Sequence, residues 1–351
     1  MLDRELPAGE VAFQFKFGDA HACIMPGQAR ARILRSVSEP SPAPTPIVIV
    51  GSPTALGGHF GGMERTPADL RALDVVGRIR RRPGLVSTRI RDAGDAPNDP
   101  GWAPDPDPRA KNRALICAYL PRLAVTVQAA LAPAPADEPG GPAARLLILG
   151  GDCTSHAGAL AGLRAARPGQ RFGVAWFDAH GDFNTPDTTP SGNVWGMPFA
   201  MMVGRGEADL LKAAAAPTVD EADAALLGGQ VLDEQESRML AASRVAHFGA
   251  GMLGTEAGMA ALGAWARAVA RRVDAFYVAF DMDALDGADG WAVTMPEPGG
   301  LSLQTAVEAV RTIAGASPIA GFGATAVLIG RGGDPERTAD AVATLAEAAL
   351  G

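Results

Sequence analysis

The chain has 351 residues and a formal net charge of −8 at pH 7. Nucleic acids and anionic membrane surfaces bind concentrated basic faces, so the acidic balance argues against both as partners. Cys23, Cys117 and Cys153 are too few and too scattered for a disulfide framework. The N-terminus lacks a signal peptide, and no apolar run approaches the ~20 residues that span a bilayer. We therefore expect a soluble, cytoplasmic protein.

The proline-rich segment 40–46 cannot be helical, and it is interpreted as the linker that ends an N-terminal extension, residues 1–46. In residues 47–351, short apolar runs alternate with stretches rich in Ala, Leu and Arg. The expected strands are residues 47–50, 145–149, 172–177, 245–248, 274–280 and 325–329. The expected helices are residues 67–81, 110–131, 155–166, 197–212, 256–271 and 302–314. The alternation predicts an α/β fold in which a mainly parallel sheet has helices on both faces.

Two clusters of acidic side chains directly follow expected strands. Asp178, His180 and Asp182 alternate along the chain, so in extended backbone they point the same way. Alone, this cluster fits a polar loop and a metal site equally well. Asp281 and Asp283 repeat the arrangement after a second strand. Because α/β sheets keep their sites at the carboxyl ends of strands, the two clusters together predict a site for two divalent ions.

Four motifs carry a family resemblance. They are Gly150-Gly151-Asp152-Cys153, Asp178-Ala179-His180-Gly181-Asp182, Ser191-Gly192-Asn193-Val194-Trp195-Gly196 and Asp281-Met282-Asp283-Ala284-Leu285-Asp286. In this order and spacing they closely resemble the arginase/agmatinase (ureohydrolase) superfamily. The chain is identified as a divergent member of it from residue 47 to the C-terminus.

The resemblance implies a three-layer α/β/α arginase-like catalytic domain over residues 47–351, with two Mn²⁺ ions at the strand ends. It implies that Asp178 and Asp281 bridge the ions, that Asp182 and Cys153 complete one site, and that His180 and Asp283 complete the other. Asp182 would also hold the attacking hydroxide by a hydrogen bond. Carboxylates with an imidazole suit Mn²⁺, and two such ions aim a hydroxide at a planar carbon.

Cys153 stands where the family generally has His. A thiolate is able to coordinate a metal, although it is softer than Mn²⁺ prefers. We expect this sulfur to be a ligand, and a buried core thiol is the alternative. His156, one helical turn further, is a second candidate for the missing ligand, but a capping or surface role is the favoured interpretation.

Trp195 occupies the position of the family's proton-shuttling His, and an indole has no titratable group. His59, in a loop that approaches the site in the family, is the candidate replacement, although a surface histidine is the simpler interpretation. Ala326 stands where the family's last strand has a Glu that holds the substrate guanidinium. No Asp or Glu occurs between Glu308 and Asp334.

Of the residues that bind the far end of the substrate in the family, some are present in this chain and one is missing. Asn184, Thr189 and Ser191, which contact the substrate carboxylate in arginases, are present, and turn and cap roles explain them equally well. The family's acidic residue for an amino-acid ammonium is expected after the strand 245–248. Residues 249–254 contain no acid.

The pattern predicts a metal-dependent hydrolase that cleaves a non-peptide C–N bond in a small guanidino, amidino or ureido compound, with L-arginine and agmatine not expected as substrates. The main alternative is a catalytically silent, structural or regulatory subunit in a hetero-oligomer with an active paralogue. A dinucleotide-binding enzyme is a third interpretation, since residues 249–254 fit Gly-x-Gly-x-x-Gly. By resemblance we expect a homo-oligomer, a trimer or a hexamer.

Overall fold

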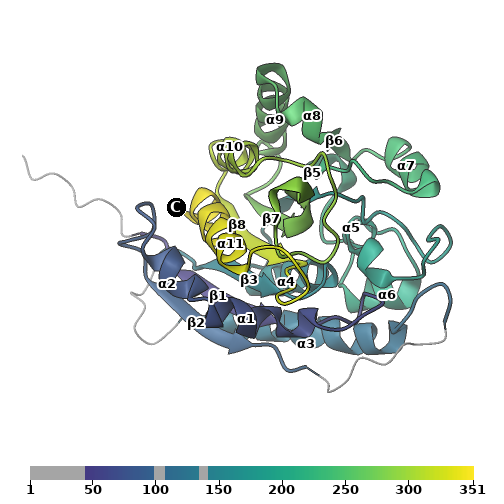
Figure 1. Cartoon of the computed structure of the whole chain (residues 1–351), viewed down its shortest axis with the longest axis horizontal. Helices are drawn as coiled ribbons and strands as arrows, with labels where there is room; N and C mark the ends of the chain where they lie inside the picture. The colour runs from purple at the N-terminus through teal and green to yellow at the C-terminus, as the bar shows by residue number, and fades with distance from the viewer. Residues whose placement is uncertain (1–43, 99–106, 134–140) are drawn as a thin grey trace, which may run out of the picture. The chain divides into compact units, whose positions relative to one another are not determined.

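The computed structural model describes residues 44–98, 107–133 and 141–351. Within them, eight parallel strands form one sheet in the order β2-β1-β3-β8-β7-β4-β5-β6 (Figure 1). The strands are β1 (Ile47–Ser52), β2 (Ile90–Asp95), β3 (Arg145–Gly150), β4 (Phe172–Asp178), β5 (Ala224–Gly228), β6 (Ala246–Phe248), β7 (Ala275–Asp281) and β8 (Ile319–Thr325). Each strand reaches the next through a crossover that contains helix, as parallel pairing requires.

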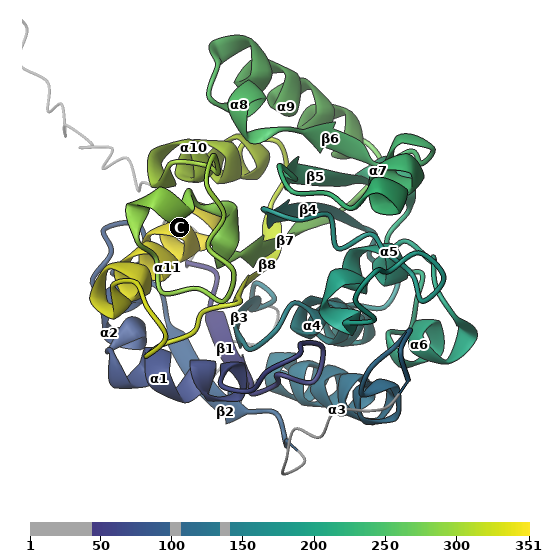
Figure 2. The same ribbon diagram turned by 45° about the vertical axis from the view of Figure 1, so that its right-hand side comes forward.

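Helices cover both faces of the sheet. Successive side chains of a strand point to opposite faces, so Ile47 and Ile49 enter one core while Val48 and Val50 enter the other. The first face is covered by α1 (Thr66–Ala72), α2 (Val75–Arg80), α8 (Ala250–Leu253), α9 (Glu256–Val269), α10 (Leu303–Ala314) and α11 (Pro335–Leu350). The second is covered by α3 (Arg113–Leu131), α4 (Thr154–Ala166), α5 (Pro198–Met202), α6 (Ala208–Ala213) and α7 (Glu234–Ala241). Figure 2 shows α10 and α11 on one side of β7 and β8, and α4 and α5 on the other. The expected three-layer α/β/α fold is confirmed.

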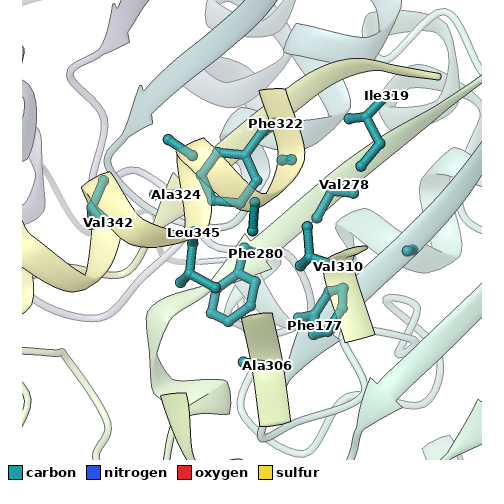
Figure 3. Close-up of a cluster of buried hydrophobic side chains, with 14 of the residues drawn as sticks. Phe177, Val278, Phe280, Ala306, Val310, Ile319, Phe322, Ala324, Val342 and Leu345 are labelled. Atoms are coloured by element: carbon teal, nitrogen blue, oxygen red, sulfur yellow. The ribbon is translucent and has the colours of Figure 1, made fainter. Parts of the chain in front are cut away.

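Aromatic side chains fill the core beneath the central strands. Phe177 of β4 stacks on Phe280 of β7 with ring centroids 4.9 Å apart, and Phe322 of β8 lies 6.2 Å beyond Phe280. Val310 of α10 and Leu345 of α11 close this core from the helical layer (Figure 3). Such close packing leaves little freedom, so the carboxyl ends of β4, β7 and β8 are held in fixed relative positions.

Helix α3 is, among the described residues, the one helix long and apolar enough to cross a membrane by length and composition. It lies against α4, where small residues permit a close approach. A Cβ atom added to Gly162 would lie 2.6 Å from Cβ of Val127. Leu120 and Leu123 are fully buried in the same layer. We interpret α3 as a covering helix of the sheet.

Most of the expected strands are present, and three parts of the sheet differ from expectation. The prediction of a strand at residues 325–329 is wrong, because β8 ends at Thr325. Strands β2 and β5 were not expected. The close approach of β8 to its neighbours depends on glycine: a Cβ atom on Gly323 would lie 2.8 Å from Cε1 of His156. Residues 1–43 lie outside the described residues, so the N-terminal extension stays a prediction.

Candidate metal centre and active site

The candidate site lies at the carboxyl ends of β3, β7 and β4. Strands β3 and β4 are consecutive in sequence, but β8 and β7 lie between them. The strand order therefore changes direction here, which is where open α/β sheets bind ligands. A cavity of about 330 Å³ opens at this point. Its lining includes Cys153, His180, Asp182, Asp281, Asp283, His59, Asn184, Thr189, Ser191, Asn193, Trp195, Val231, Asp233, Glu236, Thr294, Met295 and Glu297.

Two groups of three ligand atoms meet at the base of the cavity and share Asp178. Cys153, Asp178 and Asp281 form one group, and Asp178, His180 and Asp283 form the other; within each group all ligand atoms lie within 4.8 Å of one another. In the first group, Sγ of Cys153 donates to Oδ2 of Asp281 over 2.8 Å. In the second, Nδ1 of His180 lies 3.2 Å from Asp178 Oδ1 and 3.4 Å from Asp283 Oδ2.

The backbone after each strand orients these carboxylates. Oδ1 of Asp281 accepts the N–H of Asp283 at 2.9 Å, so Oδ2 is left to face Cys153. Oδ1 of Asp283 accepts the N–H of Ala179 at 3.2 Å, so its Oδ2 faces His180. The backbone after β4 thus orients a carboxylate that follows β7, and this hydrogen bond links the two strand ends.

Asp182 lies on the cavity wall beside these groups, in left-handed backbone with φ of 47°. Its Oδ2 atom is buried and has no hydrogen-bond partner within the part of the chain that the structure describes. Leaving a buried acceptor unpaired costs about 1–3 kcal/mol. Burial, together with the charges of Asp178 and Asp281, raises the pKa of the Asp182 carboxyl well above its ordinary value. A cation or a bound water at this position would remove that cost.

The cluster carries an excess of buried negative groups. Burial, and then Asp283 and Asp178, raise the pKa of Asp281 well above its ordinary value. Burial opposes ionisation of Asp178 as well, but hydrogen bonds from His180 and its charge hold the pKa of Asp178 below its ordinary value. One imidazole does not balance four carboxylates, and divalent cations do. The donor atoms therefore fit two metal ions, with oxygen and nitrogen donors on one side and sulfur and oxygen donors on the other.

His156 does not reach the cluster. Its Nδ1 lies 2.9 Å from the Tyr277 hydroxyl and its Nε2 lies 3.0 Å from the Thr325 hydroxyl. Both ring nitrogens are thus engaged within the second core. Burial lowers the pKa of His156 to about 3, so the ring is neutral at ordinary pH. The alternative in which His156 replaces the ligand at Cys153 has no support in this geometry.

Trp195 and His59 form one wall of the cavity. The Trp195 backbone N–H donates to Gly57 O at 3.0 Å, and a Cβ atom on Gly58 would lie 2.4 Å from the indole ring. The His59 ring meets the Trp195 ring edge to face, with centroids 5.2 Å apart, and its Nδ1 lies 3.1 Å from Nδ2 of Asn193. Burial, Lys111 and Arg331 lower the pKa of His59. The sequence-predicted His59 is exposed and lines the cavity, and its lowered pKa favours the neutral ring.

Asn184, Thr189 and Ser191 also line the cavity and stabilise its loop. Thr189 Oγ1 accepts the N–H of Gly192 at 3.0 Å, and Ser191 Oγ accepts the N–H of Asn193 at 3.2 Å. Nδ2 of Asn184 donates to Asp233 Oδ2 at 2.9 Å. These residues therefore stabilise the turn and also present polar groups to the cavity.

Sequence reasoning missed two acids of the cavity, Asp233 and Glu236, because it missed β5. The acid for an ammonium was expected after the 245–248 strand, but the structure has acids in the cavity after β5, at the start of α7. Asp233 and Glu236 cap α7 reciprocally, and Glu236 Oε1 accepts the N–H of Phe183 at 2.8 Å. Burial raises the pKa of Glu236 to about 7. The signal in the sequence was Asp-x-x-Glu, which predicts a capping box and no more.

Glu297 is a third acid that the sequence analysis did not identify. It lies in the loop after β7 and lines the cavity together with Thr294 and Met295. Ala326, by contrast, is not among the lining residues. It is buried behind Thr294, whose N–H donates to Ala326 O at 2.9 Å. The wall predicted at Ala326 is therefore formed by residues 294–297.

Comparisons with known proteins agree with this architecture. Residues 45–351 match the Arginase family. The chain is 30% identical over 285 residues to the arginase of Bacillus caldovelox, which covers 78% of this chain and 88% of that protein. The solved structure of B. caldovelox arginase superposes with a TM-score of 0.75 at 28% identity, covering 88% of this chain and 98% of the other. The formimidoylglutamase of Bacillus subtilis has a similar fold, with a TM-score of 0.68 at 18% identity over 89% of this chain and 88% of the other. The protein belongs to the arginase family and is a hydrolase of that family.

Proposed function

We propose that the protein hydrolyses a non-peptide C–N bond of a small guanidino, amidino or ureido compound other than L-arginine and agmatine. The observation that carries the proposal is the pair of ligand groups sharing Asp178 at the base of the cavity. A cavity of about 330 Å³ suits a small molecule. The fold is shared with a formimidoylglutamase, so it is not restricted to proteins named arginase.

We assign two Mn²⁺ ions to the centre. Asp178 and Asp281 would lie between them, Cys153 and Asp182 would complete one site, and His180 and Asp283 the other. Such a pair of ions lowers the pKa of a water molecule and polarises the carbon that it attacks. The support for this assignment is the arrangement of donor atoms: five of these side chains form the two groups that share Asp178, and Asp182 lines the cavity beside Cys153, His180, Asp281 and Asp283.

Asp182 and His59 are the proposed catalytic residues. The unpaired Oδ2 of Asp182 accepts a hydrogen bond from the attacking water and orients it. His59 carries protons between the cavity and solvent, because it is exposed at the rim and its neutral ring is able to accept a proton. The leaving nitrogen needs such a proton, and Trp195 offers none.

The remaining walls define the proposed binding of the substrate. Asn184, Thr189 and Ser191 present amide and hydroxyl groups suited to a carboxylate, and Asp233 beside Asn184 suits an amino group. Near the metal centre, Glu297 suits a group that carries N–H donors. Trp195 provides a flat apolar wall against which a planar group packs.

L-Arginine and agmatine are unfavourable substrates, because the groups that would bind a guanidinium and transfer its proton are rearranged. Ala326 supplies no carboxylate from β8, and Glu297 approaches from the loop after β7 instead. A guanidinium oriented by a β8 carboxylate would therefore lose water without its partner, at a cost on the order of 2–5 kcal/mol. Trp195 in addition removes a proton carrier from the wall.

The test is a substrate screen with the Mn²⁺-loaded full chain. Guanidino acids, formimidoyl amino acids, ureido acids, L-arginine and agmatine are each assayed for release of urea, formamide or ammonia. We expect turnover with at least one of the first three classes, and its loss in Asp182→Asn. No turnover with any compound by a protein that binds two ions would contradict the proposal and favour the silent-subunit alternative. Because Asp182 is also assigned as a metal ligand, the metal content of Asp182→Asn is measured together with its activity; loss of an ion would assign the deficit to metal binding, and unchanged content would leave Asp182 with the catalytic role alone.

We also propose that the protein acts in the cytoplasm as a homo-oligomer, with a hetero-oligomer including a paralogue as the alternative. The acidic composition and the match to arginases support the cytoplasmic homo-oligomer over the alternative. Size-exclusion chromatography with light scattering measures the oligomer directly, and a monomer at micromolar concentration would contradict it.

A further inference from the structure

The two ligand groups that share Asp178 differ in one donor. The group on one side has the Nδ1 atom of His180 and two carboxylates, whereas the group on the other has the Sγ atom of Cys153 and two carboxylates. Carboxylate donors suit Mn²⁺, whereas thiolate donors select softer ions such as Zn²⁺. The centre is therefore chemically asymmetric.

The position of Cys153 is fixed by the loop after β3. A Cβ atom on Gly151 would lie 1.9 Å from Thr54 O, so only glycine fits there. The Asp152 side chain is fully buried and accepts the N–H groups of Gly57 and Thr154, both at 2.9 Å. These contacts hold the start of α4 in place, and with it the thiol. The sulfur is a preorganised donor and not a mobile side chain.

The surroundings of the sulfur are those of a ligand. A structural cysteine usually packs among apolar groups, but Sγ of Cys153 faces a carboxylate oxygen of Asp281 at 2.8 Å. Asp182, only 4% exposed, lines the same cavity with an Oδ2 atom that has no hydrogen-bond partner among the described residues. Thus the thiol and the carboxylates of Asp178 and Asp281 lie close enough to share one cation, with the unsatisfied oxygen of Asp182 on the wall of the same cavity. The neighbouring imidazole of His156 is engaged elsewhere.

We propose that the centre is heterodinuclear, with a thiophilic divalent ion of the Zn²⁺ class on the Cys153 side and Mn²⁺ on the His180 side. This inference rests on the dinuclear centre proposed above and revises one of its two ions. Its physical basis is that the metal–sulfur bond strengthens from Mn²⁺ to Zn²⁺ more than metal–oxygen bonds do. The Cys153 thiol gives up its proton when the ion binds, so each ion bound there releases one proton.

Co²⁺ is the probe for this side, because a cobalt–thiolate bond gives an intense charge-transfer band in the near ultraviolet. Metal-free full chain is titrated with Co²⁺, and the band is expected to saturate at one equivalent. Cys153→Ser, which preserves the size of the side chain, is expected to lose the band and to keep one bound ion. Cys117→Ser is the matched control, since Cys117 lies on α3 outside the cavity, and it is expected to keep the band.

Competition then tests the choice of ion. The metal-free chain is exposed to Zn²⁺ together with graded excesses of Mn²⁺, because Zn²⁺ binds most nitrogen and oxygen sites more tightly than Mn²⁺ does; it is then dialysed and its metal content is measured. We expect an excess of Mn²⁺ at which the wild type holds one ion of each kind whereas Cys153→His holds two Mn²⁺ ions, with at least tenfold tighter binding of Mn²⁺ in that variant. Circular dichroism establishes that each variant is folded.

The outcomes separate this inference from the proposed function. Two bound Co²⁺ ions without a thiolate band, or two Mn²⁺ ions in the wild type under competition, would overturn the heterodinuclear assignment and leave the hydrolase proposal in place. Failure of the folded wild type to bind any of the three metals would overturn both.

Discussion

The Oε1 atom of Glu297 lies 3.9 Å from the Nε2 atom of His180, a buried nitrogen that has no hydrogen-bond partner in residues 44–98, 107–133 and 141–351. The other nitrogen of the same ring faces Asp178 and Asp283. The imidazole therefore separates the ligand cluster from a cavity carboxylate, and Glu297 is in position to contact a substrate group held beside the metal centre.

Replacing Glu297 by Gln should weaken a substrate that carries a cationic or N–H-rich group. Loss of the charged partner of such a group costs on the order of 2–5 kcal/mol, so kcat/KM should fall by about 30- to 5,000-fold. Metal content should not change, because Glu297 is in neither ligand group. Steady-state kinetics with the substrate found in the screen measure the effect. Glu308→Gln, an exposed residue of α10, is the control, and equal kinetics for both variants would exclude Glu297 from substrate binding.

Asp281→Asn should abolish binding of both metal ions. Its Oδ2 faces Cys153, its Oδ1 orients Asp283, and we assign it as a bridge, so each half of the centre depends on it. Metal content after reconstitution and dialysis measures the loss. Asp289→Asn, which alters a half-exposed acid paired with Arg337, should bind metal as the wild type does. Retention of one or both ions by the Asp281 variant would contradict the bridging role.

L-Arginine and agmatine should be turned over very slowly by the metal-loaded enzyme. The absent β8 carboxylate removes on the order of 2–5 kcal/mol, and the absent proton carrier at Trp195 removes about 10²–10⁴-fold in rate. The missing acid in residues 249–254 is not a further obstacle, since Asp233 offers a partner for an amino-acid ammonium. Urea release near pH 9 is the measurement. Turnover within about tenfold of ~10 s⁻¹, a typical enzyme value, would show that other residues replace these groups.

His59→Ala should lower kcat by about 10²–10⁴-fold, because proton transfer to the leaving nitrogen would depend on water alone. Added imidazole should restore part of the rate, since the ring of His59 is exposed at the rim of the cavity and the space it leaves is open to solvent. His247→Ala, on β6 outside the cavity, is the matched control. A deficit that imidazole does not relieve would indicate that the ring only supports Trp195.

The folded state should lose stability as pH falls from 6.5, because burial lowers the pKa of His156 to about 3. Below pH 6.5 the unfolded chain takes up a proton on this residue while the folded chain does not, which contributes about 1.4 kcal/mol per pH unit. In His156→Gln that contribution should disappear, so the free energy of unfolding should fall less steeply between pH 6 and pH 4. Tyr277→Phe, which keeps the histidine and removes one hydrogen bond, should retain the steep dependence. Parallel curves for the wild type and His156→Gln, from denaturant titrations, would contradict this account.

The sequence predicted the ligand cluster well because its members are local. Asp178, His180 and Asp182 follow one apolar strand, Asp281 and Asp283 follow another, and the carboxyl ends of central parallel strands meet at one edge. Recognition of the two strands was enough to bring the two acidic segments to one edge of the sheet. The expected alternation in extended backbone is wrong beyond Asp178, because β4 ends there and Asp182 has left-handed backbone.

The rest of the cavity was not predictable in this way. Strand β5 is five residues long, completely buried and starts with two alanines, so its local pattern does not distinguish a strand from a helix. Missing it displaced the search for an acid from Asp233 to residues 249–254. Glu297 lies in a loop without regular structure, and only the tertiary fold brings it beside His180. The position of β8 was predicted wrongly because glycines such as Gly321 and Gly323 disfavour strands, although the close packing of β8 requires them.

The position of β8 has a consequence for biogenesis. It is the last strand in the sequence, yet it lies between β3 and β7 and is the element through which the two halves of the sheet pair. Cys153 extends from one half, whereas Asp178 and Asp281 extend from the other. A nascent chain that has not yet released residues 319–325 from the ribosome cannot close the sheet, so the group that includes Cys153 forms only when nearly the whole polypeptide is complete, whereas the group of Asp178, His180 and Asp283 lies within one half.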